Sequence, residues 1–496
     1  MKFPIPFPQF DITILGHHPG NDAKKAKGPG IPPELPPLST GQKIADFLPF
    51  KFRENTARRL AMEALGPAGN RNLTNSAQNY LVLKMASALV AGTVTKKQVE
   101  DAHGPAVAFE AQAAADSRKE LAALQVPVHM SVVWAMYNEK NRMHRHTAKN
   151  PHGEDFVRTK VVQLDWLTKD LPGITWSIIA CDDGCPQKSA ERMEKIVRQE
   201  KYPRSDGHRS VRVLKLADVI GKVSIGTVFN KLTSTDESRK GGAIVAGIDA
   251  AIKASPVQAN GTSPPRHVVC YTDADLSANL AQLGALVAPV VAENKAAALG
   301  QRYGMPGAVL IREEGPVIEP QSTGGKPDKM IILFRHFVRA QLLPNLEHVL
   351  DTQAGFKAFD AAALTPAIGR MESFKETFDI ELLLHLTQGK GADALAVKPI
   401  VFTEDFAATN FRSVEPGESH LRMVKQIVDI YTGHVAKGGT PATGDAARLL
   451  NLLEGLDLHG YQALITHLSH KDAGDTSLFD RRWPVQELFD VINPPE

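Results

Sequence analysis

Two aspartates, Asp273 and Asp275, follow an apolar run rich in β-forming residues in the stretch HVVCYTDADLSANL. Alternate residues of an extended segment point to the same side, so the pair can present two carboxylates together. Two like charges that lie close together repel each other unless a cation compensates them, which makes a divalent metal their natural partner. A metal held by one or two carboxylates and by phosphate oxygens is typical of magnesium or manganese. The alternative is that Asp275 only caps the following helix.

Two further strand ends carry polar side chains. Asp182 and Asp183 end the run WSIIACDDG, where their carboxylates can accept hydrogen bonds from a nucleobase or a ribose. The alternative for this pair is an Asp-Gly turn that the backbone requires. Tyr137, Asn138 and Glu139 form a third polar group after the apolar run SVVWAM. Each group has an ordinary structural explanation by itself, but the three together indicate a shared site.

The elements that must position these residues alternate between strand and helix. Apolar runs that predict strands, such as VHMSVVWAM, TWSIIAC, SVRVLKL and RHVVCYT, are separated by segments with helical spacing, such as FVRTKVVQLDWLTKDL and GGAIVAGIDAAIKA. This alternation predicts an α/β fold with a Rossmann-like, mostly parallel sheet that helices cover on both faces. In such sheets the ligand lies beyond the carboxyl ends of the strands, which is where the three polar groups fall.

The chain divides into four regions by composition and pattern. Residues 1–50 form an arm whose prolines and glycines prevent regular structure. Residues 51–125 are predicted to be a helical N-terminal extension, and residues 126–408 the catalytic α/β domain. Residues 409–496 show helical periodicity without a group of chemically active side chains, which predicts a helical cap. A dimerisation surface is the alternative for this last region, so a homodimer stays open.

Composition excludes several classes of protein. The 496 residues are 43% hydrophobic and 23% charged with a formal net charge of +2, which is typical of a soluble globular protein and gives no overall field for nucleic acid. No stretch has the roughly 18 uninterrupted apolar residues of a membrane span, and prolines interrupt the start where a signal peptide needs an apolar helix, so we expect a cytoplasmic protein. The sparse cysteines, Cys181, Cys185 and Cys270, favour unpaired, packed thiols over a metal site. No G-x-G-x-x-G follows a predicted strand, which argues against an oxidoreductase.

Several short motifs resemble, in order, those of inverting family 2 glycosyltransferases with the GT-A fold. These motifs are SVVWAMYNEK, IIACDDG, KGGAIVAGIDAA, YTDADLS, ALGQRY and DTQAGFKAF. The segment RHFVRAQLLPNLEHVLDTQAGFKAFD, followed by FDIELLLHL, is most similar to the dolichyl-phosphate-glucose synthase branch in content and spacing. The resemblance extends from Val126 to Phe406, a little over half of the chain.

The resemblance implies roles on the side of the nucleotide-sugar donor. It places Tyr137, Asn138 and Glu139 against the nucleotide and Asp183 against its base or ribose. Lys240 and Gly241 begin a helix near the nucleotide, where a backbone without Cβ can approach closely. Asp273 and Asp275 hold the Mn²⁺ or Mg²⁺ that bridges the diphosphate, and Arg302 faces the donor phosphate or the reacting centre. The alternatives are a solvated helix start for Lys240 and a structural ion pair for Arg302.

On the acceptor side, the resemblance implies that Gln353 and the turn around Gly355 shape the site. Asp379 stands near the reacting hydroxyl and is our candidate for the base; it is alternatively a charge that complements the helix dipole. The rivals for its task are Glu381, Glu404 and Asp405. Three basic residues on one helix, Arg335, His336 and Arg339, could bind an acidic acceptor or pyrophosphate, but a solvated face is the favoured interpretation.

Together these features predict a glycosyltransferase that transfers a hexose from a nucleotide-sugar with inversion and with a divalent metal. UDP-glucose is the favoured donor and GDP-mannose the second, both from the resemblance alone. The absence of a spanning segment argues against a polyprenol acceptor and favours a soluble one. The alternatives are a sugar-phosphate nucleotidyltransferase, although no glycine-rich loop follows the first strand, and a non-catalytic protein that binds sugar or nucleotide.

Overall fold

The structure is a computed structural model of the chain. It describes residues 71–205, 207–221, 231–238, 240–254, 264–312, 315–318, 327–404, 417–438, 442–471 and 484–493. The predicted arm over residues 1–50 and the first part of the predicted helical extension lie outside these residues. The boundaries of the four regions therefore stay predictions.

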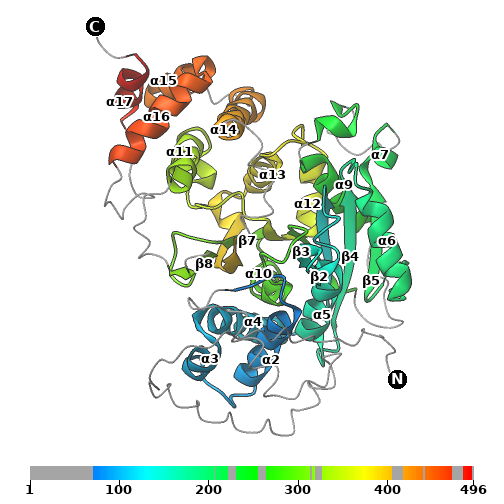
Figure 1. Ribbon diagram of the computed structural model, residues 1–496. Helices are drawn as coiled ribbons and strands as arrows, with labels where there is room; N and C mark the ends of the chain where they lie inside the picture. The colour runs from blue at the N-terminus through cyan, green and yellow to red at the C-terminus, as the bar shows by residue number, and fades with distance from the viewer. Residues whose placement is uncertain are drawn as a thin grey trace, which may run out of the picture.

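A seven-stranded sheet forms the centre of the described residues (Figure 1). In spatial order its strands are β11 (Leu395–Pro399), β7 (Ala297–Gln301), β10 (Phe356–Asp360), β6 (Arg266–Thr272), β1 (Val128–Met136), β4 (Ile174–Asp182) and β5 (Ser210–Lys215). Strand β1 pairs in parallel with β4 and β6, β4 with β5, and β7 with β11. Only β10 runs antiparallel to its neighbours within this sheet. The predicted α/β class and the mostly parallel sheet are confirmed.

The strands are apolar on both faces because helices cover both faces. Successive residues of β1 point to opposite sides, so that Val132 enters the core beneath one face and Val133 the core above the other. This double burial explains why the sequence shows continuous apolar runs instead of alternating ones. The helices beside the sheet are α5 (Phe156–Thr168), α6 (Ser189–Gln199), α7 (Leu216–Val219), α9 (Gly241–Lys253), α10 (Leu283–Ala292) and α12 (Ala361–Ile368).

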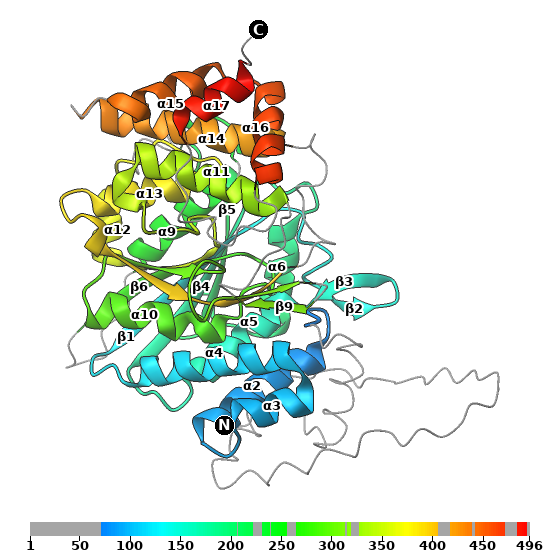
Figure 2. The ribbon, with the colours of Figure 1, turned by 90° about the vertical axis from the view of Figure 1, so that its left-hand side faces the viewer.

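Helical layers close the two ends of the molecule, as Figure 2 shows. The N-terminal layer contains α2 (Ser76–Val90), α3 (Lys96–His103) and α4 (Pro105–Ala122). The layers at the opposite end contain α11 (Pro327–Leu342), α13 (Phe378–Thr387), α14 (Glu418–Ile430), the π-helical turn η8 (Tyr431–Ala436), α15 (Gly444–Gly455), α16 (Leu458–Lys471) and α17 (Val485–Ile492). Helix α11 packs against α14, α15 and α16. The helical character predicted for both flanks is thus confirmed where the structure describes them.

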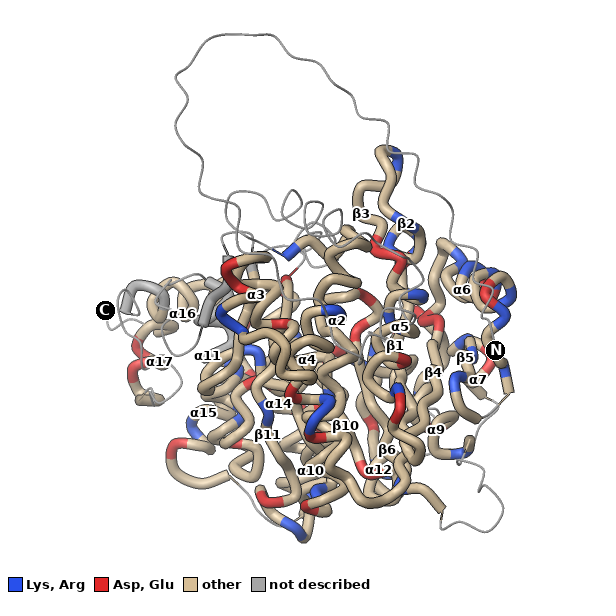
Figure 3. The backbone as a smooth tube through the Cα atoms, turned by 90° about the horizontal axis from the view of Figure 1, so that it is seen from below, with Lys and Arg blue, Asp and Glu red and all other residues tan. Residues whose placement is uncertain are grey.

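The remaining elements are short. Strands β12 (Val401–Thr403), β8 (Val309–Arg312) and β9 (Gly315–Ile318) form a second sheet, and β2 (Arg145–Thr147) pairs with β3 (Asn150–Glu154) as a projecting hairpin (Figure 2). The single 3₁₀ turns are η2 (Thr235–Glu237), η3 (Leu280–Gln282), η4 (Pro344–Leu346) and η5 (Ala392–Ala394). Figure 3 shows acidic and basic residues interspersed along the described chain.

The structure also bears on what the sequence predicted for the cysteines and for membrane-spanning helices. All three cysteines are buried and free, as their sparse distribution predicted. In the described part of the chain, no helix has both the length and the apolar character that crossing a membrane requires.

A pair of histidines lies between neighbouring strands of the central sheet. The rings of His129 on β1 and His267 on β6 are 5.6 Å apart. His129 lies 2.9 Å from the hydroxyl of Thr175 and 3.0 Å from that of Ser177, while His267 lies 2.9 Å from that of Ser131. Burial is the main reason that the pKa of each imidazole falls from 6.5 to about 4, and for His129 the second ring contributes to this decrease. Both rings are therefore neutral in the folded protein at pH 7.

We predict that acid destabilises the fold through this pair. Because the folded pKa lies below the unfolded one, the unfolded chain binds more protons, so stability is complete above about pH 6.5 and falls as the pH drops toward 4. Each histidine contributes up to about 3 kcal/mol to this loss. Urea unfolding at several pH values should show a smaller loss below pH 6.5 in His129→Gln than in the exposed control His459→Gln. Equal pH profiles for the two variants would contradict the prediction.

Candidate active site

The carboxyl ends of three adjacent strands place the acidic groups at one edge of the sheet. Strand β1 lies between β4 and β6, and Met136 at its end is in register with Asp182. The chain builds the sheet to one side of β1 through β4 and β5 and then returns to its other side with β6. The loops after β1 and β6 therefore leave the sheet at a topological switch point, which is where open α/β sheets bind their ligands.

The other half of the sheet brings further predicted residues to the same edge. Because β10 is antiparallel to β6, its first residue, Phe356, pairs with Thr272 at the end of β6. Gln353 and Gly355, which precede β10, therefore lie beside the loop after β6. Strand β7 also runs antiparallel to β10, so Arg302 emerges from its carboxyl end at this edge. The fold thus gathers residues separated by more than 200 positions in the sequence.

Arg142 joins the loops on the two sides of the switch point. Its guanidinium donates to Asp275 Oδ2 at 2.8 Å and to Glu139 Oε1 at 2.8 Å, and its Nε lies 2.8 Å from Glu139 Oε2 as an ion pair. Burial raises the pKa of Glu139 to about 7, against the opposing effect of Arg142. Asp275 Oδ1 accepts from the backbone N–H of Ser277 at 3.1 Å. Asp275 does not cap a helix; Asn279 caps the following 3₁₀ turn instead.

Lys160 supplies a second cation beneath the acidic loops. It lies on α5, is fully buried, and its Nζ has no hydrogen-bond partner and stands 5.6 Å from the centre of the Trp134 ring. Burial lowers its pKa to about 8, while Asp275 and Asp273 oppose that change. Neither Arg142 nor Lys160 was identified from the sequence. The signal for Lys160 is its position one turn after Phe156 and one turn before Leu164, on the apolar face of the helix.

Lys240 forms an ion pair with Asp273. Its backbone N–H also donates to Asp183 Oδ2 at 2.9 Å, so that one residue connects the ends of β4 and β6. Lys240 precedes α9 with φ +77°, a conformation that costs free energy in a residue with a side chain and is common at functional sites. Lys240 is thus a helix start whose side chain, 43% exposed, also pairs with Asp273, and its role at the nucleotide stays a prediction.

Gly355 allows the turn before β10 to lie directly against Asp273. A Cβ at position 355 would stand 2.4 Å from the carboxyl carbon and from both carboxylate oxygens of Asp273. The carbonyl of Gly355 also accepts a hydrogen bond from the backbone N–H of Asp273 at 3.1 Å. Only a residue without a side chain fits here. Gly355 thus supports the carboxylate directly.

Asp379 lies in a buried polar group with Lys357 and Gln353. Its Oδ2 is 3.0 Å from Lys357 Nζ, and its Oδ1 accepts from Gln353 Nε2 at 2.7 Å. Burial raises the pKa of Asp379, against the opposing charge of Lys357. The ring of Tyr271 lies between two cations, with Lys240 Nζ 5.6 Å and Lys357 Nζ 5.2 Å from its centre. Asp379 does stand in the first turn of α13, but its carboxylate contacts side chains of the site.

Arg302 forms a bidentate ion pair with the buried Asp351, at 2.7 and 2.9 Å. Its guanidinium also lies 5.0 Å from the centre of the Phe402 ring. Burial raises the pKa of the Asp351 carboxyl, but the charge and hydrogen bonds of Arg302 outweigh it and hold that pKa below its usual value. This contact is the structural ion pair that we considered as the alternative role of Arg302. A direct role of Arg302 at the donor therefore stays a prediction.

The basic residues of α11 are not a solvated face, which corrects our expectation. Arg339 and His336 are buried, and Arg339 donates to the carbonyl of Leu346 and lies 2.6 Å from His336 Nδ1. The Nε atom of Arg335 is buried without a hydrogen-bond partner, and burial lowers the pKa of both arginines. These side chains line a small cavity together with Tyr303, Leu350, Thr352, Gln353, Ile380 and Ile427.

The other predicted residues have distinct surroundings. Tyr137 is 45% exposed at the switch point, and Asn138 follows it with φ +60°. Both oxygens of Asp182 accept backbone N–H groups, from Cys185 at 2.8 Å and from Ala190 at 2.9 Å, which is the turn-forming role left as an alternative.

The other candidates for the catalytic base have different contacts from those of Asp379. Glu381 accepts backbone N–H groups of Glu372 and Ser373, each at 2.7 Å. Glu404 follows β12, and Asp405 lies outside the described residues. Asp379, in contrast, accepts a hydrogen bond from Gln353, another residue predicted for the acceptor side.

Comparisons with known proteins return no matching family model and no matching curated protein. Among solved structures, glucosyl-3-phosphoglycerate synthase from Mycobacterium tuberculosis is 16% identical, with 67% of this chain and 87% of that chain covered and a TM-score of 0.38. The same enzyme in complex with Mn²⁺, uridine diphosphate and glucosyl-3-phosphoglycerate is 16% identical, with 66% of this chain and 84% of that chain covered and a TM-score of 0.38. A mycobacterial protein is also 16% identical, with 67% of this chain and 80% of that chain covered and a TM-score of 0.39. A likeness at this level carries no argument about activity.

We predict that removing only one partner of the buried Lys357–Asp379 pair strongly destabilises the fold. Removing the cation in Lys357→Met leaves a buried carboxylate without its partner, which should cost about 3–5 kcal/mol of unfolding free energy. The double variant Lys357→Met/Asp379→Asn should recover much of that loss. Lys398, whose ion pair with Glu120 is partly exposed, is the control, and Lys398→Met should change stability by less than about 1 kcal/mol. Equal urea midpoints for Lys357→Met and Lys398→Met would disprove the prediction.

Proposed function

We propose that this chain is a glycosyltransferase that uses a nucleoside diphosphate sugar and a divalent metal. The observation that carries the proposal is the arrangement at the switch point. Asp273 and Asp275 follow one strand, Glu139 follows its neighbour, and Arg142 and Lys240 neutralise them. A site that alternates carboxylates with cations suits a metal together with a diphosphate, because the metal binds the carboxylates and the cations bind phosphate oxygens.

The residues at this edge fit Mn²⁺ or Mg²⁺. Their donors are carboxylate oxygens, the ligands that these hard cations prefer, and the side chains of Asp273 and Asp275 are 24% and 18% exposed, so a ligand can reach both. Asp275 and Asp273 would hold the ion. When bound there, it stabilises negative charge on the leaving diphosphate as a Lewis acid.

The protein's own residues supply the remaining contacts to the donor. The exposed ring of Tyr137 is available to stack on a base, and Asn138 and Glu139 follow it in the same loop. Asp183 would contact the base or ribose from the neighbouring strand. Arg142 and Lys240 stand where phosphate oxygens would pair with them, which is the main electrostatic support for the departing diphosphate.

Asp379 is the proposed base on the acceptor side. A buried carboxylate with a raised pKa is a better proton acceptor than an exposed one, and proton transfer of this kind contributes about 10²- to 10⁴-fold. Gln353 holds one carboxylate oxygen and Lys357 the other, so the group keeps a single orientation. Attack by the acceptor from the face opposite the diphosphate inverts the sugar. If the acceptor oxygen is already a phosphate, Asp379 orients it instead.

The cationic side chains near Gln353 favour an acceptor with a negative charge. Arg335 and Arg339 lie on α11 beside the cavity that Gln353 also lines, and Asp351, the acidic residue near both among those that the structure describes, is already paired with Arg302. Buried cations in excess over buried anions are stabilised when an anion binds. We therefore propose a soluble acceptor that carries a phosphate or carboxylate. UDP-glucose stays the favoured donor and GDP-mannose the second.

Thermal stabilisation by nucleotide and metal tests the donor site. UDP or GDP with Mn²⁺ should raise the melting temperature of the wild-type protein, and Asp275→Asn should lose most of the rise because it removes a carboxylate ligand. Asp393→Asn, which changes an exposed aspartate far from the switch point, should keep the full rise. A rise that is equal without metal, or equal in Asp275→Asn, would count against the proposal.

A product assay on the same preparations separates the remaining functions. Release of nucleoside diphosphate from one of several UDP- and GDP-sugars indicates glycosyl transfer, and it should increase with glycerol 3-phosphate more than with glycerol if the acceptor is anionic. Formation of nucleotide-sugar from a sugar phosphate and a nucleoside triphosphate indicates a nucleotidyltransferase instead. Binding without either product indicates a protein that only binds sugar or nucleotide.

A further inference from the structure

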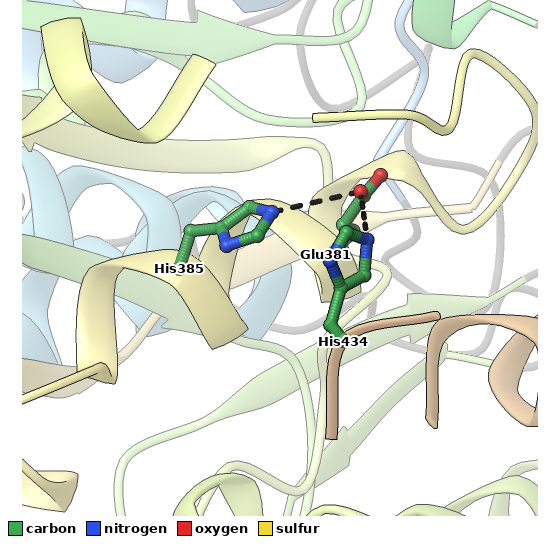
Figure 4. A group of neighbouring side chains, drawn as sticks. All are labelled: Glu381, His385 and His434. Carbon is green, nitrogen blue, oxygen red and sulfur yellow. Dashed lines mark ion pairs between the residues drawn. The ribbon is translucent and has the colours of Figure 1, made fainter. Parts of the chain in front are cut away.

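A second group of metal-binding side chains lies on the C-terminal half of the chain. Glu381 and His385 are one turn apart on α13, and His434 reaches them from the π-helical turn η8 (Figure 4). One ligand atom from each residue lies within 4.8 Å of the other two. Within the ranges that the structure describes, this is the only such group of three. Single π-helical turns are frequent at functional sites.

The ring of His385 is buried without a hydrogen bond to either nitrogen. Its side chain is 2% exposed. The nearest charged atom is Glu381 Oε1, 3.6 Å from His385 Nε2, which is too far for a hydrogen bond. Leaving a buried polar group unsatisfied costs roughly 1–3 kcal/mol. A ligand that binds the ring nitrogen would remove this cost.

Glu381 is held in a fixed orientation and is charged. Its two oxygens accept the backbone N–H groups of Glu372 and Ser373, and His434 Nε2 lies 2.6 Å from Oε1. Burial by itself raises the pKa of a carboxyl, but the two neighbouring histidines and these backbone hydrogen bonds lower that of Glu381 to about 2. Hydrogen bonds of this kind orient the carboxylate in many metal sites. The side chain of Glu381 is 1% exposed, so it is a buried anion that a cation would stabilise.

We propose that Glu381, His385 and His434 bind a transition metal ion of the zinc class. Two imidazoles and one carboxylate are typical ligands of Zn²⁺ and its neighbours, whereas Mg²⁺ and Ca²⁺ prefer oxygen ligands alone. The ligands of this site have other partners than the carboxylates of the sheet edge, because Glu381 accepts the backbone N–H groups of residues 372 and 373, whereas Asp273 pairs with Lys240 and Asp275 with Arg142. A water molecule would complete a tetrahedral shell.

The ligand atoms all lie within 4.8 Å of one another, so a movement of ~1.5 Å or less brings each pair to the spacing of a zinc site. Two ligand atoms of a tetrahedral zinc site with bonds of ~2.0–2.1 Å are ~3.3 Å apart. The distance from Glu381 Oε1 to His385 Nε2, 3.6 Å, is already near this value. The distance from Glu381 Oε1 to His434 Nε2, 2.6 Å, must increase by less than ~1 Å. His434 is 15% exposed and the least buried of the three, so it is the ligand that moves.

The bound ion would fasten the C-terminal helices to the donor side of the sheet. It would join α13 and η8 at the point where Glu381 holds the loop before α13. The same loop contacts the start of α9, because the carbonyl of Phe374 accepts from the backbone N–H of Gly242 at 3.1 Å. A Cβ on Gly241 would lie 2.6 Å from the carbonyl oxygen of Lys375, so the two segments are in close contact. The role we assign to the ion is therefore structural.

Zinc binding to the full chain tests the proposal. Protein stripped with a chelator should take up Zn²⁺ in equilibrium dialysis, and its melting temperature should rise. His434→Gln can still donate a hydrogen bond to Glu381 but binds zinc poorly, so it should lose the site without losing the fold; His385→Asn should lose it as well. His467→Gln is the matched control, since His467 forms an ordinary pair with Glu487 at 2.8 Å, and it should bind as the wild type does.

The same measurement distinguishes this site from the sheet edge. Asp275→Asn should keep the zinc that His434→Gln loses, and Co²⁺ bound to the wild type but not to His434→Gln should show the visible absorption of a site with nitrogen ligands. Circular dichroism confirms that each variant is folded. The proposal is overturned if the wild type binds no Zn²⁺, if His434→Gln and His385→Asn bind as much as the wild type, or if Asp275→Asn alone removes it.

Discussion

Carboxylates that a parallel sheet brings to one edge must be neutralised, and this requirement organises the centre of the molecule. Asp275 and Asp273 follow the same strand, and without compensation their charges would repel each other. Arg142 and Lys240 form ion pairs with them, while Lys160 lies beneath them as a buried positive charge. Each cation comes from a different segment of the chain. The charge balance therefore links the loop after β1, helix α5 and the start of α9.

This balance connects the fold to the proposed chemistry. Without a ligand, Arg142 and Lys240 neutralise the carboxylates. If a metal ion binds the carboxylates, the same two side chains can pair with the oxygens of a diphosphate. The site therefore needs little rearrangement, which is the basis of electrostatic catalysis. On the acceptor side, Asp379 and its partner Lys357 repeat the pattern in a more buried position. Gly355 connects the two halves because its turn lies against Asp273.

The sequence predicted the sheet, the flanking helices and the edge where the acidic residues meet, because these depend on local periodicity and on strand direction. It did not identify Arg142, Lys160 or Lys357, since a cation becomes part of the site only through the tertiary contact that pairs it. The interpretation of Arg339 as solvated was wrong for a related reason. Helix α11 has an apolar face by its pattern, but α14, α15 and α16 also cover it, and no local pattern shows that second layer. The role of Arg302 stays a prediction, because an ion pair with a buried aspartate has no local signal.

The central claim is that a diphosphate and a metal bind between the loops after β1 and β6. A crystal structure of the full chain with UDP and Mn²⁺ tests it most directly. We expect the ion on a carboxylate oxygen of Asp275 and the diphosphate in contact with Arg142 or Lys240. A nucleotide bound elsewhere, with the Arg142–Asp275 ion pair intact, would contradict it.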